Sequence, residues 1–306
     1  MKCIRVASAF MASTIILIAA SPPLAASQSQ ALPSVVALAD HDQLTQLAPK
    51  LARLANRTPG VVAVSVVDLS NGYSIAINGD KNLPAASTIK VPVMVEVFRQ
   101  IDLGKFGFNR SVSLLDRDRD CGYGSLCGAR WGATFTVWQL LWRMITVSDN
   151  TATNMLIRLV GRQSINQTMN SLGCTQTWLG DSIRSDGDVR ELRTSANDMM
   201  RMLDMIAQRR LITPQASDIM LEILAGQRHN HLLPEWLPKG LTIAHKTGTL
   251  HDTLNDVGIV ELDGAPYVIC VLTTHLQDLD AGQLFIRQVS LLTFRAFFQK
   301  NAISAN

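Results

Sequence analysis

The sequence predicts an α+β fold, in which an antiparallel sheet with flanking helices is built from both ends of the folded chain around a central, all-helical subdomain. Two observations lead to this class. Runs rich in β-branched residues lie near the start and again near the end of the chain, and the stretch between them has apolar residues at helical spacing. The chain has 306 residues, of which 47% are hydrophobic and 17% charged, so it is long and apolar enough to bury a sizeable core.

The N-terminus has the pattern of a secretory signal peptide. Lys2 and Arg5 precede the apolar stretch 6–20, and Ser21-Pro22-Pro23 and small residues follow it. The stretch is shorter than the ~20 residues that cross a bilayer, which argues against an anchor. We therefore predict a signal peptide over residues 1–26, a linker over 27–41, and an exported protein, periplasmic or secreted, without stable membrane insertion after cleavage.

The two ends of the folded chain supply the sheet. A helix is expected at about 43–54, followed by a hairpin whose turn contains Asn71-Gly72, a pair that favours two-stranded turns. A second β block lies downstream, with Asp263-Gly264 as a turn, and a final helix is expected at about 283–298. The expected strands are 61–67, 73–77, 242–245, 257–262 and 267–273. The α/β part of the domain, which spans 42–300, then covers about 42–86 and 210–300.

The centre, about 87–209, is predicted to be helical. Apolar periodicity predicts helices at about 88–99, 137–145, 151–160 and 194–206, with Thr194 and Ser195 as candidate caps of the last. Between the last two helices, residues 174–193 are rich in Asp, Gly and Arg and lack periodicity, so we predict a loop there. Polar loops often carry function.

Composition excludes some functions. The formal charge is only +3 and no basic run occurs, which argues against a nucleic-acid partner. After removal of Cys3, four cysteines allow three pairings, of which Cys121–Cys127, in a Gly-rich loop, is favoured. Cys270 lies in an apolar run and is expected to be a buried thiol. No spacing typical of a metal site occurs, so we expect neither metal nor cofactor.

Three short motifs carry chemistry. Ser87 and Lys90 stand three residues apart, so that on a helix the amine can reach the hydroxyl, which needs a neighbouring base to become nucleophilic. Ser148-Asp149-Asn150 offers a second hydroxyl and an amide, and Lys246-Thr247-Gly248-Thr249 offers a cation and hydroxyls for a substrate carboxylate. Each motif alone has an ordinary explanation. The Ser87–Lys90 spacing is common by chance, Ser148-Asp149-Asn150 is typical of a helix cap, and Lys246-Thr247-Gly248 is typical of a turn. The strings SDN and KTG are each expected only about 0.04 times by chance in such a chain, so their joint occurrence in this order is informative.

These motifs resemble those of the penicillin-recognising acyl-serine enzymes, and most closely the class A β-lactamase group. The similarity extends over about residues 42–300. It includes the flanks of the motifs, at 87–94, 148–154 and 245–249, and the pair Asn255-Asp256 on the following strand. The resemblance implies the fold of the β-lactamases and DD-peptidases, with the active site between the sheet edge and the helical part.

The resemblance also implies roles for individual residues. Ser87 is the expected nucleophile and Lys90 takes or relays its proton, while Ser148 protonates the leaving group and Lys246 completes the catalytic set. The backbone N–H groups of Ser87 and Thr249 form the expected oxyanion hole. The expected substrate-binding residues are Asn150, Thr247, Gly248 and Thr249.

One element of the class A pattern is missing. The group carries a Glu in an E-x-x-L-N string that activates the deacylating water, and no such string occurs here. The corresponding loop is also shorter. Asp186, Asp188 and Glu191 are the candidates for a deacylation base, although the composition favours solvated loop carboxylates paired with nearby arginines.

The missing Glu leaves three functions open. We favour β-lactam hydrolysis through an acyl-enzyme at Ser87, because the group is dominated by that activity. A D-alanyl-D-alanine carboxypeptidase-type penicillin-binding protein forms the same kind of acyl-serine but can be trapped by penicillin. A β-lactam sensor without turnover is the third alternative. The expected partner is a small β-lactam or a peptide ending in D-Ala-D-Ala, and we take the protein to be a monomer.

Overall fold

The computed structural model describes residues 42–185 and 191–304. The signal peptide and linker expected at 1–41, and Asp186 and Asp188, lie outside the described residues. The elements are α1 (Asp42–Arg57), β1 (Val61–Asp68), β2 (Ser74–Ile77), β3 (Leu83–Pro84), α2 (Lys90–Asp102), β4 (Ser111–Ser113), β5 (Thr134–Thr136), α3 (Val137–Thr146), α4 (Asn150–Val160), α5 (Arg162–Ser171), β6 (Trp178–Leu179), β7 (Leu192–Thr194), α6 (Ala196–Ala207), α7 (Pro214–Ala225), β8 (Thr242–Thr249), β9 (Leu254–Glu261), β10 (Tyr267–Thr274) and α8 (Leu279–Ser304).

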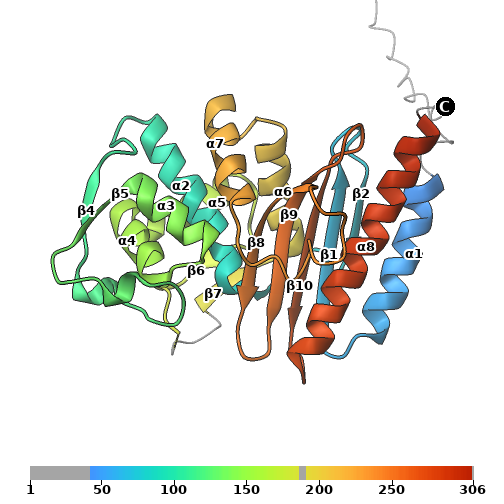
Figure 1. The fold of residues 1–306 in the computed structure, drawn as a ribbon, viewed down its shortest axis with the longest axis horizontal. Coiled ribbons are helices and arrows are strands. Elements are labelled where there is room, and N and C mark those ends of the chain that lie inside the picture. Colours follow the sequence, from blue (N-terminus) through green and yellow to red (C-terminus); the bar gives the residue numbers. More distant parts are fainter. Residues whose placement is uncertain (1–41, 186–190, 305–306) are drawn as a thin grey trace, which may run out of the picture. The chain divides into compact units, whose positions relative to one another are not determined.

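The main sheet has five antiparallel strands in the order β2-β1-β10-β9-β8. Strand β1 comes from the start of the folded chain and pairs with β10 near its end, with Val64 opposite Val271. Strand β8 lies at the edge, beside the helical part (Figure 1). The predicted sheet built from both ends of the chain is therefore confirmed, and the Lys246 motif lies on an edge strand.

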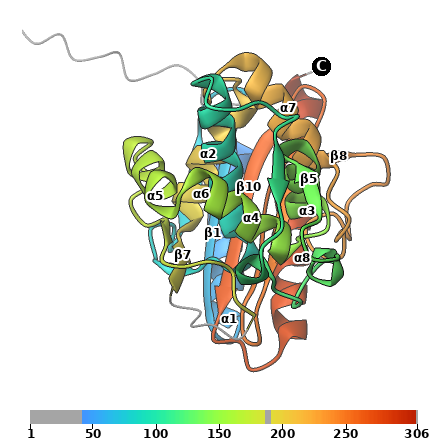
Figure 2. The same cartoon turned by 90° about the vertical axis from the view of Figure 1, so that its left-hand side faces the viewer.

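Two apolar layers enclose the sheet. Along β1, Val62, Val64 and Val66 face α1 and α8, which run side by side over one face of the sheet, whereas Ala63 and Val67 face the other layer (Figure 1). This alternation follows from the two-residue period of a strand. Helix α6 packs on β1, β9 and β10, and the other helices extend this layer (Figure 2).

Helix α2 is the centre of the helical part. Ten of its 13 residues are buried, and it contacts α3, α4 and α5. A helix that is buried on nearly all sides reads as a continuous apolar run, as 91–98 does apart from Pro92 and Glu96. Glu96 is compatible with burial because Arg99, Gln100 and Thr168 donate to its carboxylate.

The helical part is not all-helical, which corrects the prediction. Strands β4 and β5 form a two-stranded sheet, and β3, β7 and β6 form a three-stranded one. The loop predicted at 174–193 therefore contains β6 and the start of β7, and Thr194, a predicted cap, ends β7, while Ser195 caps α6. Strands of two or three residues are too short to show alternation in a sequence.

Two helices were missed, and several elements are longer than expected, most clearly β8 and α8. The start of α7 carries a usable signal, because Thr213 caps it and Pro214 occupies its first turn. Helix α5 follows Gly161 directly and has no such cap. Strand β8 continues to Thr249 although its second half is polar, because β9 supplies hydrogen-bond partners along its whole length. Helix α8 begins at Leu279 and runs to Ser304.

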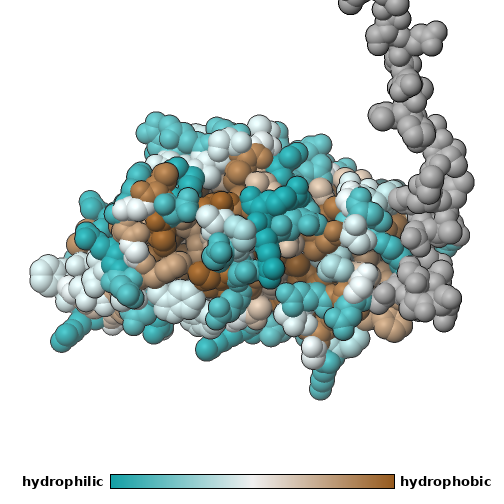
Figure 3. Space-filling view, turned by 90° about the horizontal axis from the view of Figure 1, so that it is seen from above, coloured by the Kyte–Doolittle hydropathy of each residue, from teal (hydrophilic) through white to brown (hydrophobic). Residues whose placement is uncertain are grey.

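Cysteine and surface features complete the description. Cys121 and Cys127 form a disulfide, as predicted, and Cys270 is a buried free thiol, as is Cys174. On the face seen in Figure 3, hydrophobic residues are interspersed with hydrophilic ones. Among the residues that the structure describes, no helix is long and apolar enough to cross a membrane.

Candidate active site

Ser87 lies in a 3-10 turn, Ala86–Ile89, that leads directly into α2. Ala86 has a positive φ of 47°, which turns the chain sharply before the serine. Lys90 is the first residue of α2, one turn later, and its Nζ lies 3.0 Å from Ser87 Oγ. The predicted pair is thus in hydrogen-bond contact at a helix start.

Lys90 is fully buried, and four oxygens surround its amine. Besides Ser87 Oγ, they are the carbonyl and Oγ of Ser148, at 2.7 and 2.9 Å, and Oδ1 of Asn150, at 2.7 Å. An ammonium has only three hydrogens and cannot donate to all four oxygens at once. A neutral amine has a lone pair, with which it can accept a proton from a hydroxyl.

Burial and the nearby charge of Lys246 hold the pKa of Lys90 well below its ordinary value of 10.5, against the opposing effect of Asp149 and Asp120. Both causes disfavour the ammonium form. Lys90 can therefore be neutral at a pH where an exposed lysine is charged, and a neutral amine 3.0 Å from Ser87 Oγ can act as its base.

The second motif lies between α3 and α4. Ser148 has a positive φ of 57°, which turns its hydroxyl and carbonyl toward Lys90. Asp149 caps α4 through the N–H of Ala152 and also accepts the N–H groups of Ser125 and Leu126. The cap interpretation is thus true of the aspartate, while its two neighbours face the lysine.

A loop from the helical part supports this turn. The N–H of Asn150 donates to the carbonyl of Tyr123 at 3.0 Å. Gly124, next along that loop, has a φ of 86°, and a Cβ there would lie 2.2 Å from the Asp149 carboxylate. Only glycine fits this backbone against the aspartate.

Strand β8 brings the third motif to the same place. A Cβ on Gly248 would lie 3.0 Å from Ala86 Cβ and 3.1 Å from the backbone nitrogen of Ser87, so glycine allows the strand to approach the turn closely. Lys246 Nζ lies 3.1 Å from Ser148 Oγ and 2.8 Å from the carbonyl of Thr247. Burial lowers the pKa of Lys246 to about 7, although Asp256 opposes the shift.

A pocket of about 190 Å³ opens over these groups. The residues that line it are Ser87, Tyr123, Ser148, His229, His231, Thr247, Thr249, Leu254, Leu279 and Gln283. Thr249 thus faces the nucleophile from β8. Tyr123, His229 and His231 were not predicted to line the pocket, because they belong to no motif. Arg228, beside them, lines a separate pocket with Trp138 and Trp142.

The residues of the pocket come from six separate parts of the sequence. Comparison with known proteins shows which family has this arrangement. The model of the β-lactamase enzyme family, Beta-lactamase2, matches residues 46–297. The chain belongs to this family. The predicted family and fold class are confirmed, and with them the assignment as a serine β-lactamase-type hydrolase.

Individual members of the β-lactamase enzyme family and related structures are similar over most of the chain. A mutant of PBP-A, in an acyl-enzyme complex with penicillin G, is 31% identical with a TM-score of 0.79, over 84% of this chain and 97% of that one. A β-lactamase from Sphaerobacter thermophilus is 29% identical with a TM-score of 0.78, over 83% and 97%. β-Lactamase VEB-1 of Pseudomonas aeruginosa is 22% identical, over 84% of this chain and 92% of its own length.

Of the candidate deacylation bases, Glu191 is the one that the structure describes, and it does not line the pocket. Glu191 is exposed, and its carboxylate lies against Gly180. Among the residues in the described ranges, no carboxylate lines the Ser87 pocket, and no group of three metal-ligating side chains occurs.

Proposed function

We propose that the protein opens β-lactams by forming an ester between Ser87 Oγ and the carbonyl carbon of the lactam. The observation that carries this proposal is the buried amine of Lys90, which lies 3.0 Å from the Oγ of Ser87, a residue that lines the pocket. A serine hydroxyl needs such a base, and burial keeps this one available in its neutral form.

Proton transfers accompany the two bond changes. As Oγ attacks, its proton passes to Lys90 Nζ and the carbonyl oxygen becomes an oxyanion. The C–N bond then breaks, and the nitrogen takes a proton from Ser148 Oγ, which lies 2.9 Å from Lys90 and 3.1 Å from Lys246. Ser148 recovers a proton from these amines. Water later hydrolyses the ester and releases Ser87.

The other motif residues bind the substrate in this proposal, and Thr247 and Thr249 among them line the pocket. The N–H groups of Ser87 and Thr249 receive the oxyanion, since both residues line the pocket. Lys246, Thr247 and Thr249 hold the carboxylate, and Gly248 leaves room for it. Asn150 contacts the acyl side of the substrate as well as Lys90.

A D-alanyl-D-alanine carboxypeptidase is the second candidate, because no carboxylate among the described residues lines the pocket. Such an enzyme forms the same ester but is trapped by penicillin. A β-lactamase instead needs a base for water, which we assign to the loop that includes Asp186, Asp188 and Glu191. A sensor without turnover would also be trapped, but would release no D-alanine.

The test is the intact-protein mass after mixing with benzylpenicillin, sampled from seconds to hours, with hydrolysed penicillin measured in parallel. We expect a transient adduct on Ser87 and accumulating product. A persistent adduct together with release of D-alanine from a D-Ala-D-Ala peptide would establish the peptidase instead, and a persistent adduct alone the sensor. The absence of both an adduct and hydrolysis would overturn the proposed chemistry.

The proposed role of Lys246 predicts a pH dependence. Its ammonium form, which attracts the substrate carboxylate, is lost as the pH rises through about 7. The dissociation constant of benzylpenicillin before acylation is therefore expected to rise above pH 7, by at most about tenfold per pH unit. Rapid-mixing kinetics between pH 6 and 9 measure it. The methyl ester of benzylpenicillin, which has no carboxylate, is the control and is expected to lack this rise; a flat profile for both compounds would exclude this role.

We also propose that the protein is exported by the signal peptide at residues 1–26. The charged start and apolar stretch of the N-terminus support this, and so does the Cys121–Cys127 disulfide, because such bonds persist in oxidising compartments. N-terminal sequencing of the protein from periplasmic and culture fractions tests the cleavage site.

A further inference from the structure

Asp120 has no place in the three motifs, yet its carboxylate contacts one of them. It lies in the segment between β4 and β5, directly before the disulfide-bonded Cys121, and is 9% exposed. Its backbone is held to α4, because its N–H donates to Thr151 Oγ1 at 3.1 Å. The carboxylate is thus fixed at the start of α4, beside the site.

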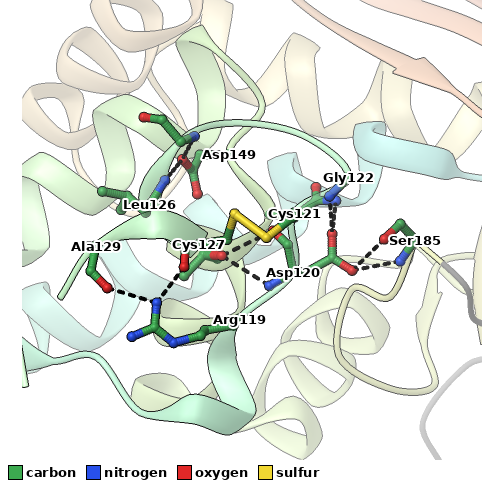
Figure 4. The surroundings of a disulfide bond; sticks show 12 residues. Arg119, Asp120, Cys121, Gly122, Leu126, Cys127, Ala129, Asp149 and Ser185 are labelled. Atoms are coloured by element: carbon green, nitrogen blue, oxygen red, sulfur yellow. Dashed lines mark hydrogen bonds between the residues drawn. A yellow bond between two sulfur atoms is a disulfide. The ribbon is translucent and has the colours of Figure 1, made fainter. Parts of the chain in front are cut away.

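Four donors use the two oxygens of this carboxylate. Oδ1 accepts from Nδ2 of Asn150 at 2.7 Å and from the N–H of Gly122 at 3.0 Å. Oδ2 accepts from the N–H and the hydroxyl of Ser185, at 2.7 and 2.9 Å (Figure 4). Burial alone would raise the pKa of this carboxyl, but these hydrogen bonds keep it below its ordinary value, so Asp120 is ionised at neutral pH.

The amide of Asn150 is held from two sides. Its Oδ1 accepts from Lys90 Nζ at 2.7 Å, while its Nδ2 donates to Asp120. An amide has an acceptor at one end and a donor at the other, so a half-turn of the side chain would place its NH₂ group against the lysine. An ionised carboxylate only accepts, and it therefore selects the orientation in which the amide oxygen faces Lys90.

The other carboxylate near this turn cannot take that part. The oxygens of Asp149 accept the N–H groups of Ser125, Leu126 and Ala152, and no hydrogen bond joins it to the Asn150 side chain. Ser185, in contrast, lies in the loop where the deacylation base is sought. Asp120 therefore joins Asn150 to that loop.

We propose that Asp120 is a positioning residue for acylation: its carboxylate holds the Asn150 amide with its oxygen toward Lys90 and anchors the loop at Ser185 to the same point. This inference rests on the proposed acylation of Ser87. Asp120 does not touch the nucleophile in this arrangement but acts through Asn150, which contacts both Lys90 and the substrate.

A double-mutant cycle tests the proposal. The variants are Asp120→Ala, Asn150→Ala and the double variant, and the readout is the second-order rate constant for acylation by benzylpenicillin, from intact-protein mass. We expect Asp120→Ala to lower this constant by about tenfold or more, because small errors in the placement of a catalytic group are costly. In the Asn150→Ala background the same change is expected to have little further effect, since Asp120 then has no amide to orient.

Ser185→Ala is the matched control. It removes one donor to the same carboxylate but leaves the Asn150 contact in place, so acylation is expected to stay within about threefold of the wild type. Thermal unfolding is measured for every variant. If Asp120→Ala does not fold, Asp120→Leu, which has a similar shape but no acceptor for the Asn150 amide, takes its place in the cycle.

A pH profile supplies a readout that a merely structural role would not move. Lys90 faces Lys246 on β8, Asp149 and Asp120, and the negative charge of Asp120 raises its pKa. Without that charge, Lys90 remains neutral to lower pH. The acid limb of the acylation profile is therefore expected to shift to lower pH in Asp120→Ala.

The outcomes separate this inference from the proposed function. A wild type that forms no adduct refutes the acylation itself. A wild type that is acylated, with a folded Asp120→Ala variant acylated equally fast, refutes the role of Asp120 alone. An equal loss with and without Asn150 shows that Asp120 acts by another route and also overturns the inference.

Discussion

Ser87→Ala is expected to abolish both the benzylpenicillin adduct and turnover, with the rate falling by at least about 10,000-fold. The substitution removes the oxygen that forms the ester, and the structure offers no replacement within reach of Lys90 in the same position. Ser148 Oγ also contacts Lys90, at 2.9 Å, but it contacts Lys246 as well and lies on another segment. Hydrolysis of benzylpenicillin and intact-protein mass measure the effect.

The fold is expected to tolerate this change. Ser87 Oγ has Lys90 as its hydrogen-bond partner, and the lysine retains three other acceptors. The thermal midpoint should therefore stay close to that of the wild type. Ser125→Ala, which removes an exposed hydroxyl from the neighbouring loop, is the control and should keep full activity. Adduct formation by Ser87→Ala at the wild-type rate would show that another residue is the nucleophile.

Lys90→Met is expected to lower acylation by about 100- to 10,000-fold, the range that a positioned general base contributes. Methionine is similar in length but has no amine, so the Ser87 proton has no acceptor at this position. The rate constant for adduct formation, measured over pH 6 to 9, should also lose the acid limb that we attribute to Lys90, whose pKa is lowered by burial and by Lys246.

The same change is expected to lower the unfolding free energy by about 1–3 kcal/mol. Lys90 is fully buried, and methionine leaves the carbonyl of Ser148 and Oδ1 of Asn150 without the donor that they have in the wild type. Lys105→Met, at an exposed position, controls for the loss of a surface charge. Wild-type acylation by a folded Lys90→Met protein would assign the base to a different group.

The motif residues could be predicted because their chemistry is local. Ser87 and Lys90 are one helical turn apart, so a spacing of three residues in the sequence is enough to predict their contact. The resemblance implied an active site at the sheet edge, where Lys246 lies on β8. The length of β8 was not predicted, because hydrogen bonds to β9 hold its polar second half in the sheet. How the three motifs are arranged relative to one another was implied by their resemblance to those of the penicillin-recognising acyl-serine enzymes.

Other parts of the site have no local signal. Tyr123, His229 and Asp120 belong to loops whose composition resembles any polar loop, and they reach the pocket or Asn150 only because the helical part folds them there. The same holds for the disulfide, which the Gly-rich loop favoured but which required two Cα atoms 5.3 Å apart.

The sequence by itself determined the division into a sheet built from both ends of the chain and a helical centre, the family, and the nucleophile with its neighbouring amine, because these depend on periodicity and on spacings of a few residues. Only the tertiary structure decided which charges surround Lys90, which carboxylate orients Asn150, and that Lys246 loses its proton near pH 7. These properties arise from burial and from contacts between segments distant in the chain, and the free energy of a charge depends on all of its neighbours at once.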